Sequence, residues 1–243
     1  TSPRLRAAQE ARLRNAPVSW HDSLDDVPEM PLLLVANEFF DALPIRQIVR
    51  RGDLWRERRV GVVGNGSLGF VDGEVAQAPP GDAFDTAPDG ETAEIADASA
   101  SIARAIGTRL ADRPGAALVV DYGYRQASPG DTLQALRSKR SADPLDAPGE
   151  ADLTAHVNFE ALGRYIREAG AAAYGPVTQG AFLTALGIGA RAERLRAGGA
   201  DPGDLATALE RLTGVGAMGD LFKVLALTSH GLAVPPPFDM APR

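Results

Sequence analysis

The chain has 243 residues, 44% of them hydrophobic, and a formal net charge of −7 at pH 7. These values are typical of a globular protein with a sizeable core, and the acidic balance argues against nucleic-acid binding. The sequence contains no cysteine, which excludes disulfides, thiolate metal sites and cysteine nucleophiles. The three histidines lack metal-ligand spacing and no apolar run is long enough to span a membrane, so we expect no metal site and no membrane segment.

The first third of the chain predicts a helix followed by strands. Residues 2–13 begin with a serine N-cap and a proline at the first helical position, and residues 18–21 predict a short strand. The continuous apolar run over 32–36 is typical of a strand buried on both faces of a parallel sheet. Residues 45–75 alternate apolar and polar side chains around a hairpin signal at Asn65-Gly66, which predicts a β-rich insertion.

The remainder of the chain alternates helices, loops and strands. The apolar spacing over 92–110 predicts a helix with Glu91 as its first-turn carboxylate. The apolar run over 116–120 predicts a second buried strand. The elements expected after it are an irregular region over 125–157 with a short helical stretch near 132–136, helices over 158–170, 182–195 and 202–212, a strand over 221–228 and a loose tail over 233–243.

Polar residues follow the apolar run over 32–36, as they would at a ligand site. In open α/β sheets, ligands bind just beyond the carboxyl ends of the strands. Asn37 and Glu38 stand at such an end, with Phe39 and Phe40 as apolar walls and Asp41 after them. A site is one interpretation. In the other, Asp41 caps a helix and Glu38 is a solvated loop charge.

A second group of candidates follows the second apolar run. Asp121 ends the strand and points toward the same crevice, and Tyr122 and Tyr124 would wall a substrate channel. The alternative for Asp121 is an Asp-x-Gly turn. His156 lies in a loop and would orient a substrate or relay a proton, although a lone loop histidine is more often structural.

Two further segments bear on cofactor binding. Asp22 follows the short strand over 18–21, where its carboxylate can accept a hydrogen bond from an adenine amine. The alternative is that Asp22 or Ser23 caps the next turn. Gly214 to Gly219 match the G-x-G-x-x-G pattern, but a helix precedes them and a strand follows, the reverse of a phosphate-binding turn. We therefore expect only a turn into the last strand.

Three segments together resemble one protein family. Asn37 to Pro44, Asp121 to Tyr124 and Gly149 to His156 are similar to the MidA-type family of class I S-adenosylmethionine (SAM) methyltransferases. This family includes the mitochondrial complex I assembly factor that methylates an arginine of a partner subunit. The resemblance implies an α/β, Rossmann-like sheet in a single domain over 1–232, with the β-hairpin insertion over 45–75 and a loop and helical substrate-side region over 125–215.

The resemblance also implies roles for the candidate residues. The cofactor is SAM, with Asp22, Ser23 and Asn37 as its contacts. The substrate is an arginine of a partner protein, with Glu38 as first choice for orienting the guanidinium, Asp41 as second, and Asn37 fixing the geometry. No metal is implied. The substrate-binding residues are Phe39, Phe40, Asp121, Tyr122, Tyr124 and His156.

The sequence departs from the family pattern at its start. In the family, strand one, a glycine-rich turn, a helix and strand two precede the part of the sequence that this chain resembles. We expect the sheet to be incomplete at the N-terminus, so that this chain alone is inactive and binds SAM weakly. Two alternatives are a non-catalytic assembly module with a degenerate fold, and a hydrolase, which the absence of a G-x-S-x-G elbow disfavours. A homodimer is left open, and the expected location is the bacterial cytoplasm, or the mitochondrial matrix for a eukaryotic protein.

Overall fold

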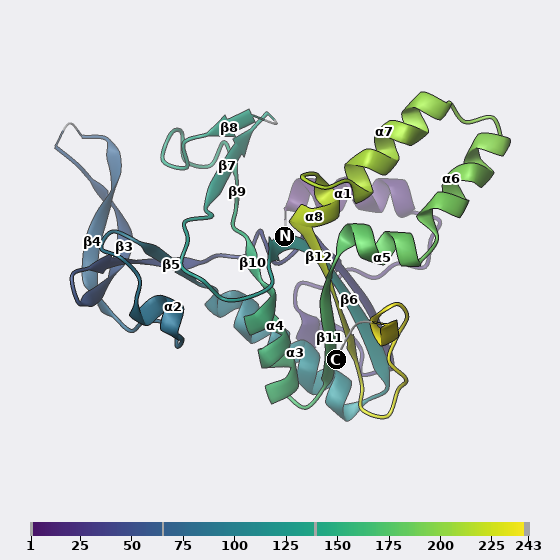
Figure 1. Ribbon diagram of the computed structural model, residues 1–243, viewed down its shortest axis with the longest axis horizontal. Coiled ribbons are helices and arrows are strands. Elements are labelled where there is room, and N and C mark those ends of the chain that lie inside the picture. The colour runs from purple at the N-terminus through teal and green to yellow at the C-terminus, as the bar shows by residue number, and fades with distance from the viewer. Residues whose placement is uncertain (1, 65, 139, 241–243) are drawn as a thin grey trace. The chain divides into compact units, whose positions relative to one another are not determined.

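The computed structural model describes residues 2–64, 66–138 and 140–240, and the chain divides into two compact units, Thr1–Pro31 and Leu32–Arg243. Figure 1 labels the elements on the ribbon. The first unit contains the helix α1 (Pro3–Leu13) and the short 3-10 helix η1 (Leu24–Asp26). The strand expected over 18–21 is wrong, because no strand among the described residues pairs with this segment.

Side chains hold the first unit together instead. The expected N-cap of α1 is confirmed, since the Ser2 hydroxyl accepts a hydrogen bond from the Leu5 N–H at 3.4 Å. Farther along, the Trp20 Nε1–H donates to the Gln9 side chain at 3.1 Å. The segment after α1 is therefore fixed to the helix by side-chain contacts.

The main sheet of the second unit is mixed. Its strands, in spatial order, are β1 (Leu32–Asn37), β6 (Gly115–Tyr124), β12 (Phe222–Thr228) and β11 (Ala172–Thr178), and β10 (Val157–Asn158) also pairs with β6. β1 runs parallel to β6, whereas β12 runs antiparallel to both of its neighbours. The carboxyl ends of β1 and β6 therefore meet at one end of the sheet, where α/β proteins place their ligands.

β1 is an edge strand, which corrects one expectation. It hydrogen-bonds to β6 alone within the described residues. Its outward-facing side chains Leu33 and Val35 are 87% and 74% exposed, so the strand is not buried on both faces. An apolar run shows that a strand is suited to burial, but the layers packed on the two faces of the sheet decide whether its side chains are buried.

Two helices pack against each other beside the main sheet. They are α3 (Asp97–Asp112) and α4 (Phe159–Glu168), and α4 also contacts β11 and β12. The Asn158 side chain accepts a hydrogen bond from the Ala161 N–H at 3.0 Å, which confirms the expected cap of α4. The helix expected over 92–110 starts only at Asp97. The residues before it form a strand instead.

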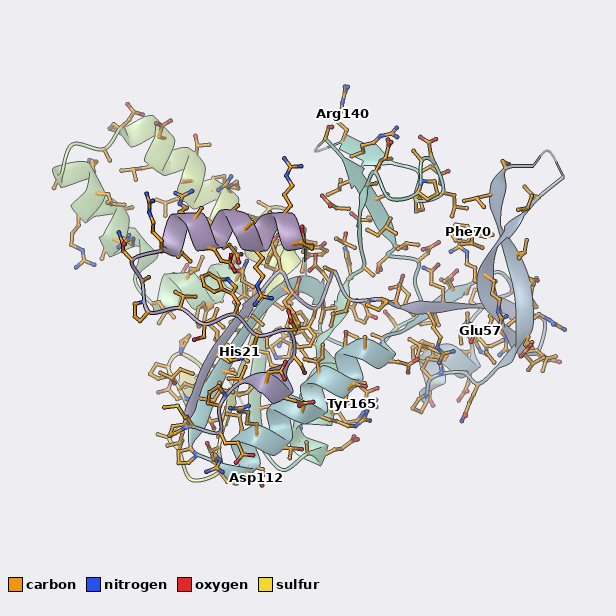
Figure 2. The ribbon with its side chains drawn as sticks, turned by 180° about the vertical axis from the view of Figure 1, so that it is seen from behind. His21, Glu57, Phe70, Asp112, Arg140 and Tyr165 are labelled. Atoms are coloured by element: carbon orange, nitrogen blue, oxygen red, sulfur yellow. The ribbon has the colours of Figure 1, made fainter. Side chains whose placement is uncertain are left out.

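A second sheet is antiparallel. Its spatial order is β4-β3-β2-β5, with β2 (Arg46–Arg51), β3 (Leu54–Val62), β4 (Leu68–Ala76) and β5 (Thr92–Ile95). The strands expected over 45–75 are thus present, although Asn65 of the predicted hairpin signal lies outside the described residues. The Arg58 guanidinium lies 3.8 Å from the Phe70 ring centroid on the β3–β4 ribbon, where Figure 2 labels Phe70 and Glu57. The helix α2 (Asp82–Asp85) completes a core made of Ile48, Trp55, Phe84 and Ala93.

A third, smaller sheet replaces the helical stretch expected near 132–136. It consists of β8 (Arg140–Ala142), β7 (Gln134–Arg137) and β9 (Asp152–Thr154). Ala135 is buried between exposed neighbours, which is the alternation of a strand rather than the spacing of a helix.

Short helices make up much of the C-terminal part. They are α5 (Gln179–Ala185), α6 (Ile188–Ala197), α7 (Pro202–Thr213) and α8 (Met218–Leu221). The single helix expected over 182–195 is broken, because Gly187 adopts a left-handed φ of 84° between α5 and α6. The glycine-rich segment before β12 forms a turn and α8. In the tail, the ring of Phe238 packs on that of Phe182. None of the described helices has the length and apolar character needed to cross a membrane.

Candidate functional site

The site begins where β1 ends. The β1–β6 pairing closes with a hydrogen bond from the Glu38 N–H to the Val120 carbonyl at 3.0 Å. Glu38 then adopts a left-handed φ of 46°, which is uncommon for a residue with a side chain. Its exposed carboxylate accepts a hydrogen bond from the Asn37 amide at 3.3 Å. The expected carboxylate and amide are thus adjacent and open to solvent.

Asp121 holds the turn after Glu38 in place. One oxygen of its fully buried carboxylate accepts hydrogen bonds from the backbone N–H groups of Phe39, Phe40 and Asp41, at 3.2, 3.0 and 3.3 Å. Burial, and then the charge of Asp41, raise the pKa of Asp121 to about 6. A side chain with no exposed surface cannot contact a substrate. The structure therefore places Asp121 behind the site, where it supports the motif.

Asp41 is also buried and is paired with Tyr122. The Tyr122 hydroxyl donates to Asp41 Oδ2, and both burial and this bond raise the pKa of Tyr122. Asp41 Oδ1 has no hydrogen-bond partner within the described part of the chain. The alternative that Asp41 caps a helix is wrong, since no helix starts within residues 42–44. Phe39, in contrast, is 43% exposed beside the buried ring of Phe40.

Pairing of β10 with β6 brings His156 to the same end of the sheet. A Cβ atom at Gly123 would lie 2.1 Å from the Val157 carbonyl oxygen, so only glycine permits this approach. The His156 ring lies 5.5 Å from the Tyr122 ring, and its backbone N–H donates to the Thr132 hydroxyl at 2.8 Å. Burial lowers the pKa of His156, which keeps the imidazole neutral at neutral pH.

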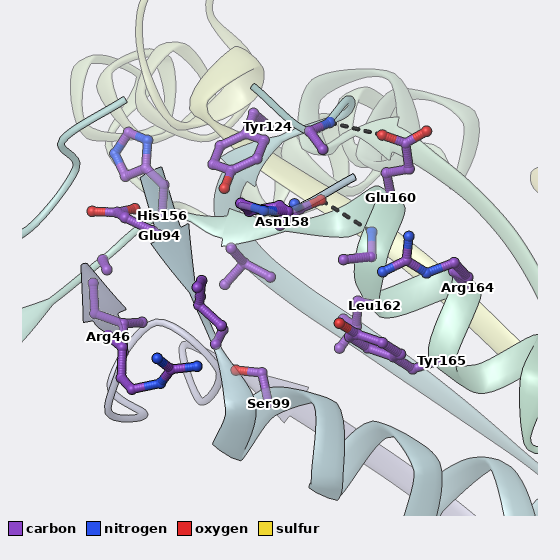
Figure 3. Close-up of a pocket in the computed structure, with 18 of the residues that line it drawn as sticks. Arg46, Glu94, Ser99, Tyr124, His156, Asn158, Glu160, Leu162, Arg164 and Tyr165 are labelled. Atoms are coloured by element: carbon purple, nitrogen blue, oxygen red, sulfur yellow. Dashed lines mark hydrogen bonds between the residues drawn. The ribbon is translucent and has the colours of Figure 1, made fainter. Parts of the chain in front are cut away.

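A cavity of about 360 Å³ is lined by His156 and by Phe40 of the turn after β1. Figure 3 draws the residues around it. Of the predicted site residues, Phe40, Tyr124 and His156 line it. Asn37, Glu38, Phe39, Asp41, Asp121 and Tyr122 lie outside the lining. Phe40 therefore connects the motif after β1 with the cavity. The Ala155 N–H adds a second connection, because it donates to the Asp41 carbonyl at 3.0 Å.

Glu94 is a lining residue that sequence reasoning missed. One of its oxygens accepts hydrogen bonds from the Gln47 amide at 3.0 Å and the Thr132 N–H at 2.8 Å, and the other accepts one from the Thr132 hydroxyl. The sequence predicts position 94 in the first turn of a helix over 92–110, whereas Glu94 lies on β5. The four residues from Thr92 to Ile95 are too few for their pattern to distinguish a strand from a helix.

The two predicted cofactor residues of the first unit lie in and beside a capped turn. Ser23 and Asp26 form a capping box around η1, which confirms the capping alternative for Ser23. The side chain of Asp22 is 72% exposed and accepts a hydrogen bond from Arg6 at 2.8 Å. Its carboxylate keeps acceptor capacity for a ligand. Among the described residues, no group of three or more histidine, aspartate or glutamate side chains is arranged to hold a metal.

Comparison with known proteins assigns the family. A family model described as "Putative S-adenosyl-L-methionine-dependent methyltransferase" matches residues 1–177. The chain belongs to this family. The resemblance drawn from the segments at Asn37, Asp121 and Gly149 is thereby confirmed, and the mixed α/β sheet agrees with it.

Two curated relatives carry an activity in their names. The chain is 36% identical over 220 residues to mouse "Protein arginine methyltransferase NDUFAF7, mitochondrial", a match that covers 88% of this chain and 50% of the mouse protein. It is 32% identical over 182 residues to the Caenorhabditis elegans homolog, with 73% and 42% covered. The chain thus spans about half the length of the curated relatives it matches.

A solved structure has the same fold. A crystal structure from Burkholderia thailandensis bound to S-adenosyl-homocysteine superposes with a TM-score of 0.76 and 32% identity. The match covers 93% of this chain and 62% of that one.

Proposed function

We propose that the protein is a SAM-dependent methyltransferase that modifies an arginine side chain of a partner protein. The observation that carries this proposal is the exposed Asn37–Glu38 pair at the carboxyl end of β1. Asp121 holds the turn that follows this pair. The family assignment and the names of the relatives support it.

Exposed polar residues in both units suit the cofactor. Asn37 offers an exposed amide, and Asp22 an exposed carboxylate that can accept from the adenine amine. Ser23 is the third proposed contact. SAM supplies a methyl group on a positively charged sulfur. The bound S-adenosyl-homocysteine in the Burkholderia structure supports the same cofactor class here.

The chain's own residues would orient the acceptor and remove its proton. An arginine guanidinium is protonated at neutral pH and is a poor nucleophile. The Glu38 carboxylate can pair with it, turn one nitrogen toward the methyl group and accept the proton that this nitrogen loses. Asn37 holds Glu38 through its amide, and Asp41 remains the second candidate, since its Oδ1 is unpaired within the described residues.

The proposal also covers the partner protein, the cellular location and the domain organisation. The relatives are named as mitochondrial proteins, which supports a protein substrate in the mitochondrial matrix for a eukaryotic protein. For a bacterial protein, the proposed location is the cytoplasm. A respiratory-complex subunit as the substrate and a homodimer belong to the same proposal. So do a single domain over 1–232, the β-hairpin insertion over 45–75 and the N-terminally incomplete Rossmann-like sheet.

Deleting the gene in its host tests this function. Methylarginine-containing peptides would be compared between the deletion strain and strains complemented with wild type or with Glu38→Gln. Loss of one or more methylarginines, restored by wild type alone, supports the proposal. An unchanged set of methylarginines contradicts it and favours the non-catalytic assembly module.

A further inference from the structure

The cavity beside Phe40 is lined by a carboxylate that nothing so far uses. We propose that this cavity, the Glu94 pocket, binds a guanidinium side chain of the protein substrate, with Glu94 as its counter-charge. The pocket is defined by Phe40, Glu94, Tyr124, His156, Leu162 and Tyr165 among its lining residues. The inference rests on the proposed function and deepens it, because it assigns a place to a substrate side chain.

The carboxylate of Glu94 is held rigidly. The Gln47 amide that donates to it also donates to Asp131 Oδ1 at 2.8 Å, and the Gln47 carbonyl accepts from Arg58 at 3.1 Å. The Thr132 backbone and hydroxyl supply the other donors. A carboxylate fixed in this way binds a cation without first losing side-chain freedom.

Glu94 also keeps its negative charge available. Among the described residues its hydrogen-bond donors are an amide, a hydroxyl and a backbone N–H, and none of them is a cation. Its charge acts on the pocket: burial raises the pKa of Tyr124 to about 12, and Glu94 adds to the effect. At His156 burial lowers the pKa and Glu94 opposes it. Within the described part of the chain, no cation therefore donates a hydrogen bond to the Glu94 carboxylate.

Two arginines, Arg46 and Arg164, also line the pocket, but they pair with other carboxylates. Arg46 pairs with Glu57 and, at 2.8 Å, with Asp97. Arg164 pairs with Glu168 at 3.6 Å and lies 5.0 Å from the centre of the Tyr165 ring. Figure 3 labels both arginines among the residues that line the pocket and shows Glu94 beside His156.

The other walls suit the rest of an arginine side chain. Phe40 and Tyr124 provide aromatic surfaces, on which a guanidinium stacks favourably. Ile95 and Leu162 provide apolar surface for the methylene groups. A volume of about 360 Å³ is at the small end of ligand pockets, which suits one side chain.

Two small probes test the pocket without requiring catalysis. The protein would be titrated with N-acetylarginine N-methylamide and with its citrulline analogue, in which a neutral urea replaces the guanidinium. We expect the arginine probe to bind at least about tenfold more tightly, because only it carries the charge that Glu94 attracts. Equal binding of the two probes to the wild-type protein would overturn the inference, whatever the variants do.

Variants then locate the site. Glu94→Gln should lower the preference for arginine, although Glu38 remains as the other carboxylate proposed to pair with a guanidinium. Glu74→Gln, which removes the same charge from an exposed position on β4, should leave the preference intact. NMR of the amide signals checks that Glu94→Gln is folded and shows where the probe binds. Shifts confined to residues 37–41, with Glu94, Thr132 and Tyr124 unaffected, would place the guanidinium elsewhere and reject the pocket.

Methyl transfer separates this inference from the proposed function. If the wild-type protein binds arginine selectively but transfers no methyl group, the proposed function is rejected and the pocket is retained. Transfer with unchanged KM and kcat in Glu94→Gln removes the pocket and leaves the function. Dependence on Glu94 with a single-arginine peptide identifies the occupant as the acceptor, and dependence only with a second arginine identifies it as a neighbouring residue. Both of these last outcomes support a guanidinium pocket.

Discussion

Asp121 shows how a buried carboxylate can shape a site that it does not touch. One of its two oxygens accepts hydrogen bonds from three backbone N–H groups of the turn after β1, at 3.0 to 3.3 Å. The turn includes Glu38 in a left-handed conformation, which a residue with a side chain adopts only when its surroundings favour it. Asp121 thereby offsets backbone strain at the proposed catalytic residue.

Removing this carboxylate should destabilise the fold. Asp121→Ala leaves buried N–H groups without an acceptor, and we expect the free energy of unfolding to fall by about 3 kcal/mol. Urea denaturation followed by circular dichroism measures the change. Asp112→Ala, at an exposed position in α3, is the matched control and should change stability by less than about 0.5 kcal/mol. Equal stability of the two variants would show that Asp121 does not support the turn.

The ionisation of Asp121 should make stability depend on pH. Its folded pKa of about 6 is above the ordinary value, so the folded state holds its proton more tightly than the unfolded state does. The wild-type protein should therefore lose stability relative to Asp121→Asn as the pH rises from 4 to 6. Carbon-13 NMR of the carboxyl groups measures the pKa directly. A titration midpoint below 4 would contradict this account.

Glu38 is the residue proposed to orient the acceptor arginine and to accept its proton. Glu38→Gln keeps the size of the side chain and one oxygen that can accept from the Asn37 amide, but it cannot accept a proton, so turnover should fall by about 100-fold. Binding of SAM should change little, because Glu38 is proposed to act on the acceptor. Initial rates and calorimetric SAM titration distinguish the two effects. A normal rate would exclude Glu38 from the mechanism.

The contact of β10 with β6 brings residues that line the Glu94 pocket together. The backbones approach so closely at Gly123 that a Cβ atom would lie 2.1 Å from the Val157 carbonyl oxygen. His156 and Asn158 flank Val157, and both line the Glu94 pocket. The position of this short strand therefore controls the shape of the pocket.

Gly123→Ala should displace β10. The added methyl group forces the two backbones apart, and we expect a loss of about 2 kcal/mol in stability together with weaker binding of the arginine probe. Gly130→Ala is the control, since a Cβ atom there would meet nothing within 4 Å. Denaturation and probe titration measure both variants. If Gly123→Ala binds and unfolds like Gly130→Ala, the close approach does not shape the pocket.

Elements that local pattern defines were predictable, and elements that distant pairing defines were not. The cap of α4 at Asn158 and the apolar runs of β1, β6 and β12 are visible in the sequence, because each depends on neighbouring residues. The segment over 134–137 is a strand because β8 and β9 pair with it. β5 pairs with β2, more than 40 residues earlier. No local spacing reveals such partners.

For the whole molecule, the same distinction separates the two halves of the site. Asn37 to Asp41 follow a strong strand signal directly, so their location was predictable. Glu94 and His156 are 62 positions apart in the sequence, and the pairings of β5 and β10 and shared contacts with Thr132 bring them together. The burial of Asp121 likewise depends on the turn that folds over it. Polar residues at a strand end predict a site, but contacts across the fold decide which of them face the ligand.

The most direct test of the account is methyl transfer itself. The full-length protein would be incubated with SAM carrying a labelled methyl group and with extract of the deletion strain, and the protein fraction would then be hydrolysed to amino acids. We expect labelled methylarginine with the wild-type protein and about 100-fold less with Glu38→Gln. Label absent from arginine in every reaction, while the protein binds SAM, would contradict the central claim.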